Sequence, residues 1–325
     1  MNILIRAYDV DVLEGVSGSG GEIHSIYENA ISLRFGDTLL TMVENRRGRG
    51  PGFIIIPENL IGLIGSKCKP GDIVKINLPV LDIPGSQISL NTRGADTFDS
   101  LMNPKSSGLF SVKIFKDNLS YLKSFFLKEV DISDSILCEL IPSWKSGDTN
   151  RRTGTRVTPV WRHFVKTSIE SIRIAIKNKD EFLLGEFLGR LVGMGWGLTP
   201  GGDDFVLGML GITQYIEKSS RLNPTKIFAE KHGLLSIYPD IIEKNRFLSG
   251  AINQHLPRYL GKTNFISGSY LKYALDRRYL KAFNDFLDEL FLGNLQKNGE
   301  SIQKMIEFGA TSGLDIIAGV LFVLE

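Results

Sequence analysis

Gly197-Leu198-Thr199-Pro200-Gly201-Gly202-Asp203-Asp204-Phe205 leads into an apolar run over residues 206–216, and this stretch decides how the second half of the chain folds. Thr199 suits a helix cap, and Pro200 suits the first helical position because its missing N–H would be unpaired there. Gly201 and Gly202 remove side chains, so a ligand could approach the backbone closely. The pattern predicts a rigid turn that opens a buried helix.

Asp203 and Asp204 put two carboxylates at this turn. One interpretation is structural, because an acid in a first helical turn stabilises the helix by about 0.3–1 kcal/mol. The other is a ligand site. An acidic pair repels phosphate unless a cation bridges them, and Mg²⁺ suits that arrangement. Alternatively, one of the two carboxylates could accept hydrogen bonds from a substrate –NH₂ group while the Gly and Thr backbone holds an oxygen.

A second Gly-rich helix start lies near the C-terminus, where Phe-Gly-Ala-Thr-Ser-Gly-Leu-Asp at residues 308–315 precedes the apolar run 316–324. Ser312 and Asp315 have the spacing of a capping box. Since both apolar helices must be buried, we expect residues 201–204 and 311–315 to line one pocket, with an arginine from a loop near its mouth. The alternative is that both Gly-rich segments are only helix caps.

Composition bounds the class of protein. The chain has 325 residues, enough for two domains, and a net charge of +2, which gives no electrostatic reason to expect nucleic acid or membrane. Cys68 and Cys138 suit a reducing compartment and exclude a cysteine-only zinc site. The start of the chain does not resemble a signal peptide, and no apolar run reaches the roughly 18 residues of a membrane span, so we expect a cytoplasmic protein.

Residues 1 to about 95 are predicted to be β-rich. The segments 31–35, 38–43 and 73–78 alternate apolar and polar residues, 53–56 is a short buried strand, and Gly/Pro turns separate them. Many short strands of this kind favour a small barrel or sandwich.

From about residue 96 the apolar residues recur with the spacing of a helix. The expected helices are 119–128, 167–176, 181–192, 227–232, 241–257, 269–274, 280–292 and 301–308. Residues 143–159 are polar and are predicted to be a long loop. The expected fold class is α+β, with a β-rich domain over residues 1–100 and a mainly helical domain over 101–325 that carries both Gly-rich motifs; the change should fall near residues 96–115.

Arginines in two loops could recognise a carboxylate or phosphate. Arg46 lies in the basic Gly-rich loop 46–52, and Arg151, Arg152 and Arg156 form a second cluster; either group could equally be solvated. His24 is a further candidate, although a single histidine is more often structural. The four histidines lack metal-ligand spacing, and the chain has no nucleophile elbow, Walker A sequence or dinucleotide-binding fingerprint.

The sequence GLTPGGDD at residues 197–204 resembles the signature of the AllH-like family, and residues 309–319, with a Thr-Ser-Gly-x-Asp core, resemble the family's C-terminal motif. Residues 247–256 and 269–275 look like the helices between them, and 24–27 resemble the N-terminal region. Glu243-Lys244-Asn245-Arg246 departs from the family's pattern, so a substrate contact there could differ.

The resemblance implies a subunit of an oxamate carbamoyltransferase in anaerobic allantoin and purine nitrogen breakdown. It implies carbamoyl phosphate and an amide acid such as oxamate as substrates, and AllG-like and FdrA-like partner subunits. In this hypothesis Asp203 and Asp204 are catalytic or hold Mg²⁺. The remaining candidates bind substrate: Gly197, Thr199, Gly201, Gly202, Thr311, Ser312, Asp315, Arg46 and His24. The alternative is a non-catalytic scaffold that organises partner subunits.

Overall fold

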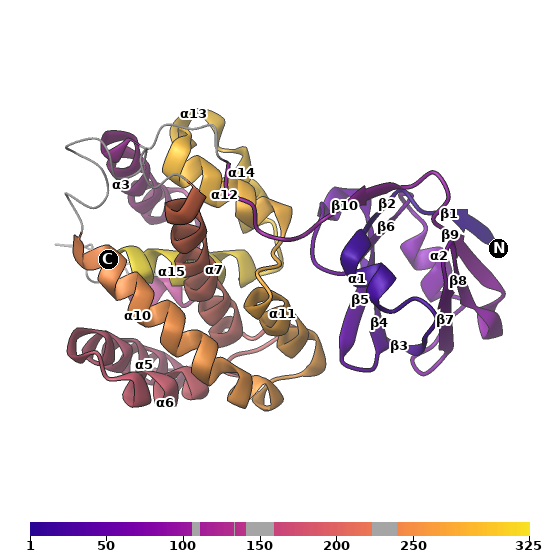
Figure 1. The fold of residues 1–325 in the computed structure, drawn as a ribbon, viewed down its shortest axis with the longest axis horizontal. Coiled ribbons are helices and arrows are strands. Elements are labelled where there is room, and N and C mark those ends of the chain that lie inside the picture. The colour runs from indigo at the N-terminus through magenta and orange to yellow at the C-terminus, as the bar shows by residue number, and fades with distance from the viewer. Residues whose placement is uncertain (106–110, 133, 141–158, 223–238) are drawn as a thin grey trace. The chain divides into compact units, whose positions relative to one another are not determined.

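The computed structural model describes residues 1–105, 111–132, 134–140, 159–222 and 239–325 (Figure 1). These residues form two compact units. The first comprises Met1–Met102 together with the short segment Arg278–Ala282, and the second comprises Asn103–Arg277 and Phe283–Glu325.

The first unit is built on one curled, mixed sheet of ten strands, all within the described residues 1–102 (Figure 1). The order is β1-β9-β8-β7-β3-β4-β5-β6-β2-β10. The pairs β1–β9, β5–β6 and β2–β10 are parallel, and the other pairs are antiparallel. The strands are β1 Asn2–Leu4, β2 Ala7–Asp9, β3 Gly20–Tyr27, β4 Ala30–Phe35, β5 Thr38–Glu44, β6 Phe53–Ile56, β7 Ile73–Asn77, β8 Val80–Ile83, β9 Ile88–Asn91 and β10 Asp96–Phe98.

Local sequence explains the central strands of this sheet. β4 and β5 form a hairpin through Gly36, whose φ of +57° suits glycine. β6 is buried along its whole length between β5 and β2, as its unbroken apolar run requires. The helices α1 (Val10–Gly15) and α2 (Ile61–Gly65) complete the unit. The β-rich prediction for this part of the chain is confirmed.

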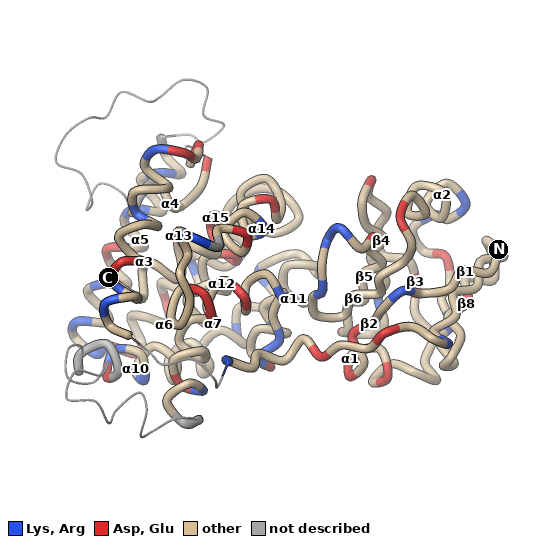
Figure 2. Tube along the Cα trace, turned by 90° about the horizontal axis from the view of Figure 1, so that it is seen from above, with Lys and Arg blue, Asp and Glu red and all other residues tan. Residues whose placement is uncertain are grey.

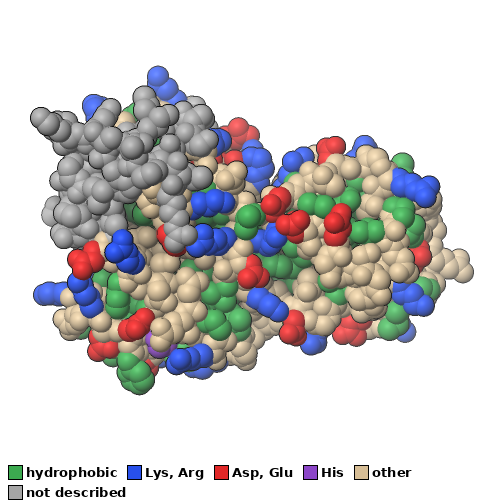
Figure 3. Space-filling view, viewed as in Figure 1, with side chains coloured by type: hydrophobic (Ala, Val, Ile, Leu, Met, Phe, Trp, Pro, Cys, Tyr) green, Lys and Arg blue, Asp and Glu red, His purple; other side chains and the backbone are tan. Residues whose placement is uncertain are grey.

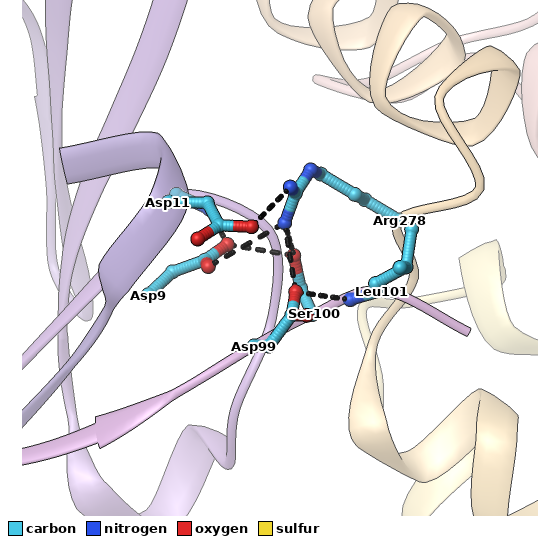
Figure 4. A network of polar contacts seen from close by, with 7 residues as sticks. Asp9, Asp11, Asp99, Ser100, Leu101 and Arg278 are labelled. Carbon is cyan, nitrogen blue, oxygen red and sulfur yellow. Dashed lines mark hydrogen bonds and ion pairs between the residues drawn. The ribbon is translucent and has the colours of Figure 1, made fainter. Parts of the chain in front are cut away.

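An ion cluster holds the segment Arg278–Ala282 within the first unit (Figure 4). The Arg278 guanidinium contacts Asp11 at 2.8 Å and Asp99 at 2.9 Å. Asp9 is fully buried beside it, where its Oδ2 accepts hydrogen bonds from the Ser100 hydroxyl at 2.6 Å and from a backbone N–H. Burial raises the pKa of Asp9, and these hydrogen bonds oppose the rise.

The second unit is mainly helical, so the predicted α+β class is confirmed. Its elements are α3 Val112–Lys128, α4 Leu137–Leu140, α5 Pro159–Asn178, α6 Glu181–Leu191, α7 Gly201–Leu222, α10 Pro239–His255, η4 Leu256–Lys262, α11 Phe265–Leu275, α12 Lys281–Leu292, α13 Leu295–Asn298, α14 Glu300–Ile306 and α15 Ser312–Leu324. Each helix expected within the described residues is present, although α3 and α5 begin seven and eight residues before the expected 119 and 167; the other bounds differ by at most four residues. The helix expected at 227–232 and the loop expected at 143–159, apart from its last residue, lie outside them.

Helices α7 and α15 form the centre of this unit (Figure 1). The rings of Phe205 and Phe322 are buried between them with centroids 5.5 Å apart. Gly208 lies against the backbone carbonyl of Ile316, and Gly319 against that of Phe205, so that a Cβ at either glycine would overlap the facing helix. Glycine is therefore needed at both positions to let the two backbones approach.

Charges are mixed over the described surface. Lys and Arg are scattered among Asp and Glu along the chain of both units (Figure 2). On the face shown in Figure 3, apolar side chains lie among charged ones. Within the described ranges, no helix combines the length and apolar character that crossing a membrane requires.

The α7–α15 contact predicts a contrast between glycines. Gly319→Ala should lower the free energy of unfolding by about 1–3 kcal/mol or more, since the added methyl group overlaps the backbone of Phe205. Gly250→Ala in α10 is the matched control, because nothing lies within 4 Å of its Cβ position, and it should stabilise the protein by about 0.5–1 kcal/mol. Urea denaturation of both variants measures this, and equal effects would contradict the close approach.

Candidate functional site

The loop between α6 and α7 is shaped by glycines in backbone conformations that other residues rarely adopt. Gly195 has a φ of +122° and Gly197 a φ of +93°. The N–H groups of Asp203 and Asp204 both donate to the carbonyl of Pro200. The helix therefore begins at Gly201, one residue later than expected, with Pro200 in the cap position. The prediction that Thr199 caps this helix is wrong.

Asp203 ties the first turn of α7 to its surroundings. Its Oδ1 accepts from the Gly193 N–H at 2.7 Å, and its Oδ2 accepts from the hydroxyls of Ser267, at 2.6 Å, and Thr263. The side chain is 1% exposed. Burial raises its pKa, and the three donors oppose that rise. The carboxylate thus joins α7 to the preceding loop and to the start of α11.

Asp204 has a different environment. It is buried, and its Oδ2 has no hydrogen-bond partner. Burial raises its pKa well above the ordinary value, and the neighbouring carboxylate of Asp315 raises it further. The hydroxyls of Ser312 and Thr199 lie near enough to oppose this rise, but they bond each other at 2.7 Å and leave Oδ2 unpaired. Asp204 thus has one buried carboxylate oxygen, Oδ2, without a hydrogen-bond donor, although the two hydroxyls act on the carboxylate as a whole.

The first turn of α15, in the second Gly-rich motif, contains another buried carboxylate, Asp315. The helix starts at Ser312 with Thr311 as its cap residue, and the Thr311 side chain makes no capping bond to a backbone N–H of the first turn, so the predicted capping box is wrong. Asp315 instead accepts, through Oδ1, from the Ser135 hydroxyl at 2.7 Å and the Ile136 N–H at 2.6 Å. Burial raises the pKa of Asp315 to about 6, against these two donors and Thr311.

The two Gly-rich motifs meet at these first turns. Thr199 bonds Ser312, Asp315 acts electrostatically on Asp204, and a Cβ at Gly201 would lie 2.8 Å from Asp315 Oδ2. Glycine at position 201 therefore leaves room for that carboxylate. A pocket between the motifs, its ligand and an arginine at its mouth stay predictions.

Other candidates have structural surroundings. The Cβ position of Gly202 is filled by the backbone carbonyls of Leu191 and Met194, which gives this glycine a packing role, while Gly197 lies in the turn before α7. Thr311 caps α15 through its carbonyl, which accepts from the Asp315 N–H.

Two candidates belong to the first unit. Arg46 follows β5, where it bonds the Asn29 side chain and pairs with Glu44 at 3.5 Å. His24 lies on β3 and its Nδ1 shares a 3.0 Å hydrogen bond with the hydroxyl of Ser25. The cluster Arg151, Arg152 and Arg156 lies outside the described residues. The proposed roles of all these arginines and of His24 stay predictions.

Sequence reasoning missed the hydroxyl groups that hold the acids. Ser267 follows Asn264 by three residues, and Asn264 caps α11, so that spacing was a usable signal for the helix start. Nothing in the sequence marks Ser135 or Thr263. Their partners lie far away in the chain, and only the fold brings them together.

The residues present do not fit Mg²⁺ between Asp203 and Asp204. The Asp203 carboxylate already accepts from three donors, one at Oδ1 and two at Oδ2, so it has at most one lone pair left for a cation. Within the described ranges, no group of three or more His, Cys, Asp or Glu side chains is placed to hold a metal ion.

Comparison with known proteins connects these two helix starts to one family. Residues 191–324 match the model of the family described as oxamate carbamoyltransferase subunit AllH. The match includes both Gly-rich motifs and the helices between them, so the resemblance seen in these residues is confirmed over this range. The family name is that of one subunit of a multi-subunit enzyme. No curated protein and no solved structure matches the chain.

Asp315 should make stability depend on pH. Because burial raises its pKa from 3.8 to about 6, the folded state binds the proton more tightly, and the free energy of unfolding falls as pH rises through this interval. Asp315→Asn retains an acceptor for Ser135 and removes the charge. We expect the variant to be more stable than the wild type at pH 7 and similar at pH 4.

Urea denaturation at several pH values between 4 and 7 tests this prediction. Asp276→Asn, at the exposed end of α11, is the matched control and should leave the pH profile unchanged. An Asp315→Asn variant with the wild-type loss of stability between pH 4 and 7 would show that this carboxylate does not titrate there.

Proposed function

We propose that this chain is the ligand-binding subunit of an oxamate carbamoyltransferase, acting with AllG-like and FdrA-like subunits in the purine nitrogen catabolism of the cytoplasm. The ligand is an amide: oxamate itself, or the carbamoyl group of carbamoyl phosphate. It binds where the first turns of α7 and α15 meet. The family match over residues 191–324 and the surroundings of Asp204 support this proposal.

The observation that carries the proposal is the buried Oδ2 of Asp204, which has no donor. An unpaired buried acceptor costs about 1–3 kcal/mol, so buried polar groups are nearly always satisfied. The –NH₂ group of an amide provides the missing N–H. Binding such a ligand would remove the cost, and the site would then prefer an amide over the corresponding acid.

Two hydroxyl groups complement this carboxyl group. Thr199 and Ser312 bond each other, and each hydroxyl has one proton and two lone pairs. One proton forms the bond between them, and the other, which lies near the Asp204 carboxylate in the unliganded protein, would turn to donate to a ligand oxygen. The amide carbonyl of oxamate carries its oxygen next to its nitrogen, so Asp204 and this hydroxyl pair together match both ends of the amide group.

The two aspartates of the GGDD sequence have separate roles in this proposal. Asp203 positions the turn through its three donors, whereas Asp204 contacts the ligand.

When the oxamate nitrogen attacks the carbamoyl carbon, a C–N bond forms, the bond to phosphate breaks and the nitrogen loses a proton. Burial raises the pKa of the Asp204 carboxyl group well above its ordinary value, which makes the carboxylate a stronger base for the proton that the nitrogen loses.

The second candidate is a non-catalytic scaffold. It is favoured by the structural use of Asp203, Gly202 and the Oδ1 atom of Asp315, all of which serve packing and connection between helices. Such a scaffold would assemble with partner subunits and bind neither oxamate nor carbamoyl phosphate.

Asp204→Asn and Asp203→Asn should separate binding from stability. In Asp204→Asn the acceptor is replaced by an –NH₂ donor that faces the ligand amide, so we expect oxamate or carbamoyl phosphate to bind at least tenfold more weakly, with no loss of stability. Asp203→Asn weakens the contacts to Thr263, Ser267 and Gly193, and it should lower the free energy of unfolding by about 1–3 kcal/mol.

Isothermal titration calorimetry with each ligand and urea denaturation make these measurements. Wild-type protein that binds neither ligand, alone or with its partner subunits, favours the scaffold. Wild-type affinity in Asp204→Asn would rule out the ligand contact assigned to this carboxyl group.

Metal dependence is a separate prediction. Since the donors around Asp203 do not fit Mg²⁺, oxamate should bind with the same affinity in EDTA and in excess Mg²⁺. The same titration in both buffers measures this, and binding that EDTA abolishes would restore the magnesium hypothesis.

A further inference from the structure

The Asp204 carboxyl group is closed off from solvent. Its Oδ2 is buried without a partner, and the side chain is 4% exposed. The –NH₂ group of a ligand forms a hydrogen bond with this oxygen only when its nitrogen comes within about 3 Å, where water does not reach in the unliganded protein. A segment that covers the carboxyl group therefore has to move before an amide binds there.

Residues 195–199, which we call the loop tip, lie between solvent and this carboxyl group. Trp196 and Leu198 are 57% and 46% exposed. Thr199, the next residue, is half-buried, and its hydroxyl lies beside the Asp204 carboxyl group. An outward movement of the loop tip would carry Thr199 with it and uncover Asp204 from the solvent side.

The base of the same loop is fixed to α7. The Gly193 N–H donates to the Asp203 carboxylate at 2.7 Å, and the Gly202 N–H donates to the Met194 carbonyl at 2.9 Å. The second of these bonds joins the residue before the loop tip to the first turn of α7. The loop tip can therefore move while the helix that carries Asp204 keeps its place.

Two glycines allow such a movement. Gly195 and Gly197 flank Trp196, and their φ angles are +122° and +93°. Glycine reaches positive and negative φ at similar cost, so rotation at these two residues can move the loop tip without strain in the residues between them. Hinges of active-site loops are commonly a few residues of this kind.

Three contacts hold the loop tip in its closed position, each from a different helix or its cap. They are the bond from the Asn264 amide to the Leu198 carbonyl at 3.0 Å, the bond between the hydroxyls of Ser312 and Thr199, and the contact of the Trp161 ring with that of Trp196 at 5.6 Å. All of these groups are uncharged. Because water replaces a neutral hydrogen bond when it breaks, the net cost of leaving the closed position is modest.

We infer that the loop tip is a gate to the ligand site, which opens about Gly195 and Gly197 to admit the amide and then closes over it. This inference rests on the proposed function, because it takes Asp204 to be the ligand contact. Closure would keep water away from the carbamoyl carbon, which water could otherwise attack in place of the oxamate nitrogen. A gate of this kind controls the rates of binding and release more than the affinity.

Asn264→Asp separates rate from affinity. It keeps the side-chain oxygen that accepts from the Ser267 N–H, and so preserves the cap of α11, but it removes the donor to the Leu198 carbonyl. Since that bond is present both before binding and after closure, its loss should raise the association and dissociation rate constants of oxamate together, each about fivefold, and leave the dissociation constant unchanged. Stopped-flow fluorescence measures both rates, with Trp196 beside Trp161 as the intrinsic reporter.

Asp204→Cys gives a readout that needs no oxamate binding. Iodoacetamide, an uncharged amide, alkylates a thiol only where it can reach it, so its rate of reaction at position 204 reports opening in the free protein. Adding Asn264→Asp to Asp204→Cys should raise this rate by about the same fivefold factor. Peptide mass spectrometry separates position 204 from Cys68 and Cys138.

Asn253→Asp is the matched control. The Asn253 side-chain amide also donates to a backbone carbonyl, that of Ser249 one turn earlier within α10. The same substitution at this position should leave the oxamate rate constants and the alkylation rate unchanged. Thermal melts of all variants check that each one folds.

Two results would overturn the gate. One is alkylation at position 204 that Asn264→Asp does not accelerate. The other is weaker oxamate binding in Asn264→Asp with an unchanged association rate constant, which would mean that Asn264 only supports the bound site. The proposed function fails separately: if the wild-type chain does not bind oxamate but alkylation still responds to Asn264→Asp, the loop tip opens and the ligand assignment is wrong. If oxamate binds and neither measurement responds, the ligand assignment stands and the gate is wrong.

Discussion

The close approach of α7 and α15 is the constraint on which the rest of the helical unit depends. Gly208 and Gly319 allow the backbones of the two helices to touch, and the buried rings of Phe205 and Phe322 fill the space beside them. Since the helices meet so near their first turns, the residues that open them are forced together. Thr199 and Ser312 then bond each other, although 113 positions separate them in the chain.

This packing brings the buried carboxyl groups of Asp203, Asp204 and Asp315 close together, and their hydrogen-bond partners differ. Asp203 has three donors, Asp315 has two for one of its oxygens, and Asp204 Oδ2 has none. Burial raises the pKa of all three, with Asp315 adding to the effect on Asp204. The three donors give Asp203 a positioning role, and under the proposed function the unpaired Oδ2 of Asp204 faces the uncharged –NH₂ group of the ligand.

Local patterns in the sequence predicted most helices and strands, because helix and strand formation depends largely on residues that are close in the chain. The segments 31–35 and 38–43, which alternate apolar and polar residues, form β4 and β5, and the apolar run after residue 205 forms the buried part of α7. The convergence of the two motifs could be expected, since both helices are too apolar to be exposed. The roles within the motif could not, because the donors for Asp203 and Asp315 come from Ser267 and Ser135, whose positions only the tertiary fold sets. The cap assignments failed for the same reason: the hydroxyls bond across the two helices instead of within one.

A crystal structure of the protein with oxamate tests the central claim most directly. The account predicts that the ligand lies between the first turns of α7 and α15, with its amide nitrogen within hydrogen-bond distance of Asp204 Oδ2 and its amide oxygen near the hydroxyls of Thr199 and Ser312. Oxamate bound elsewhere on the chain, with Asp204 Oδ2 still unpaired, would contradict it.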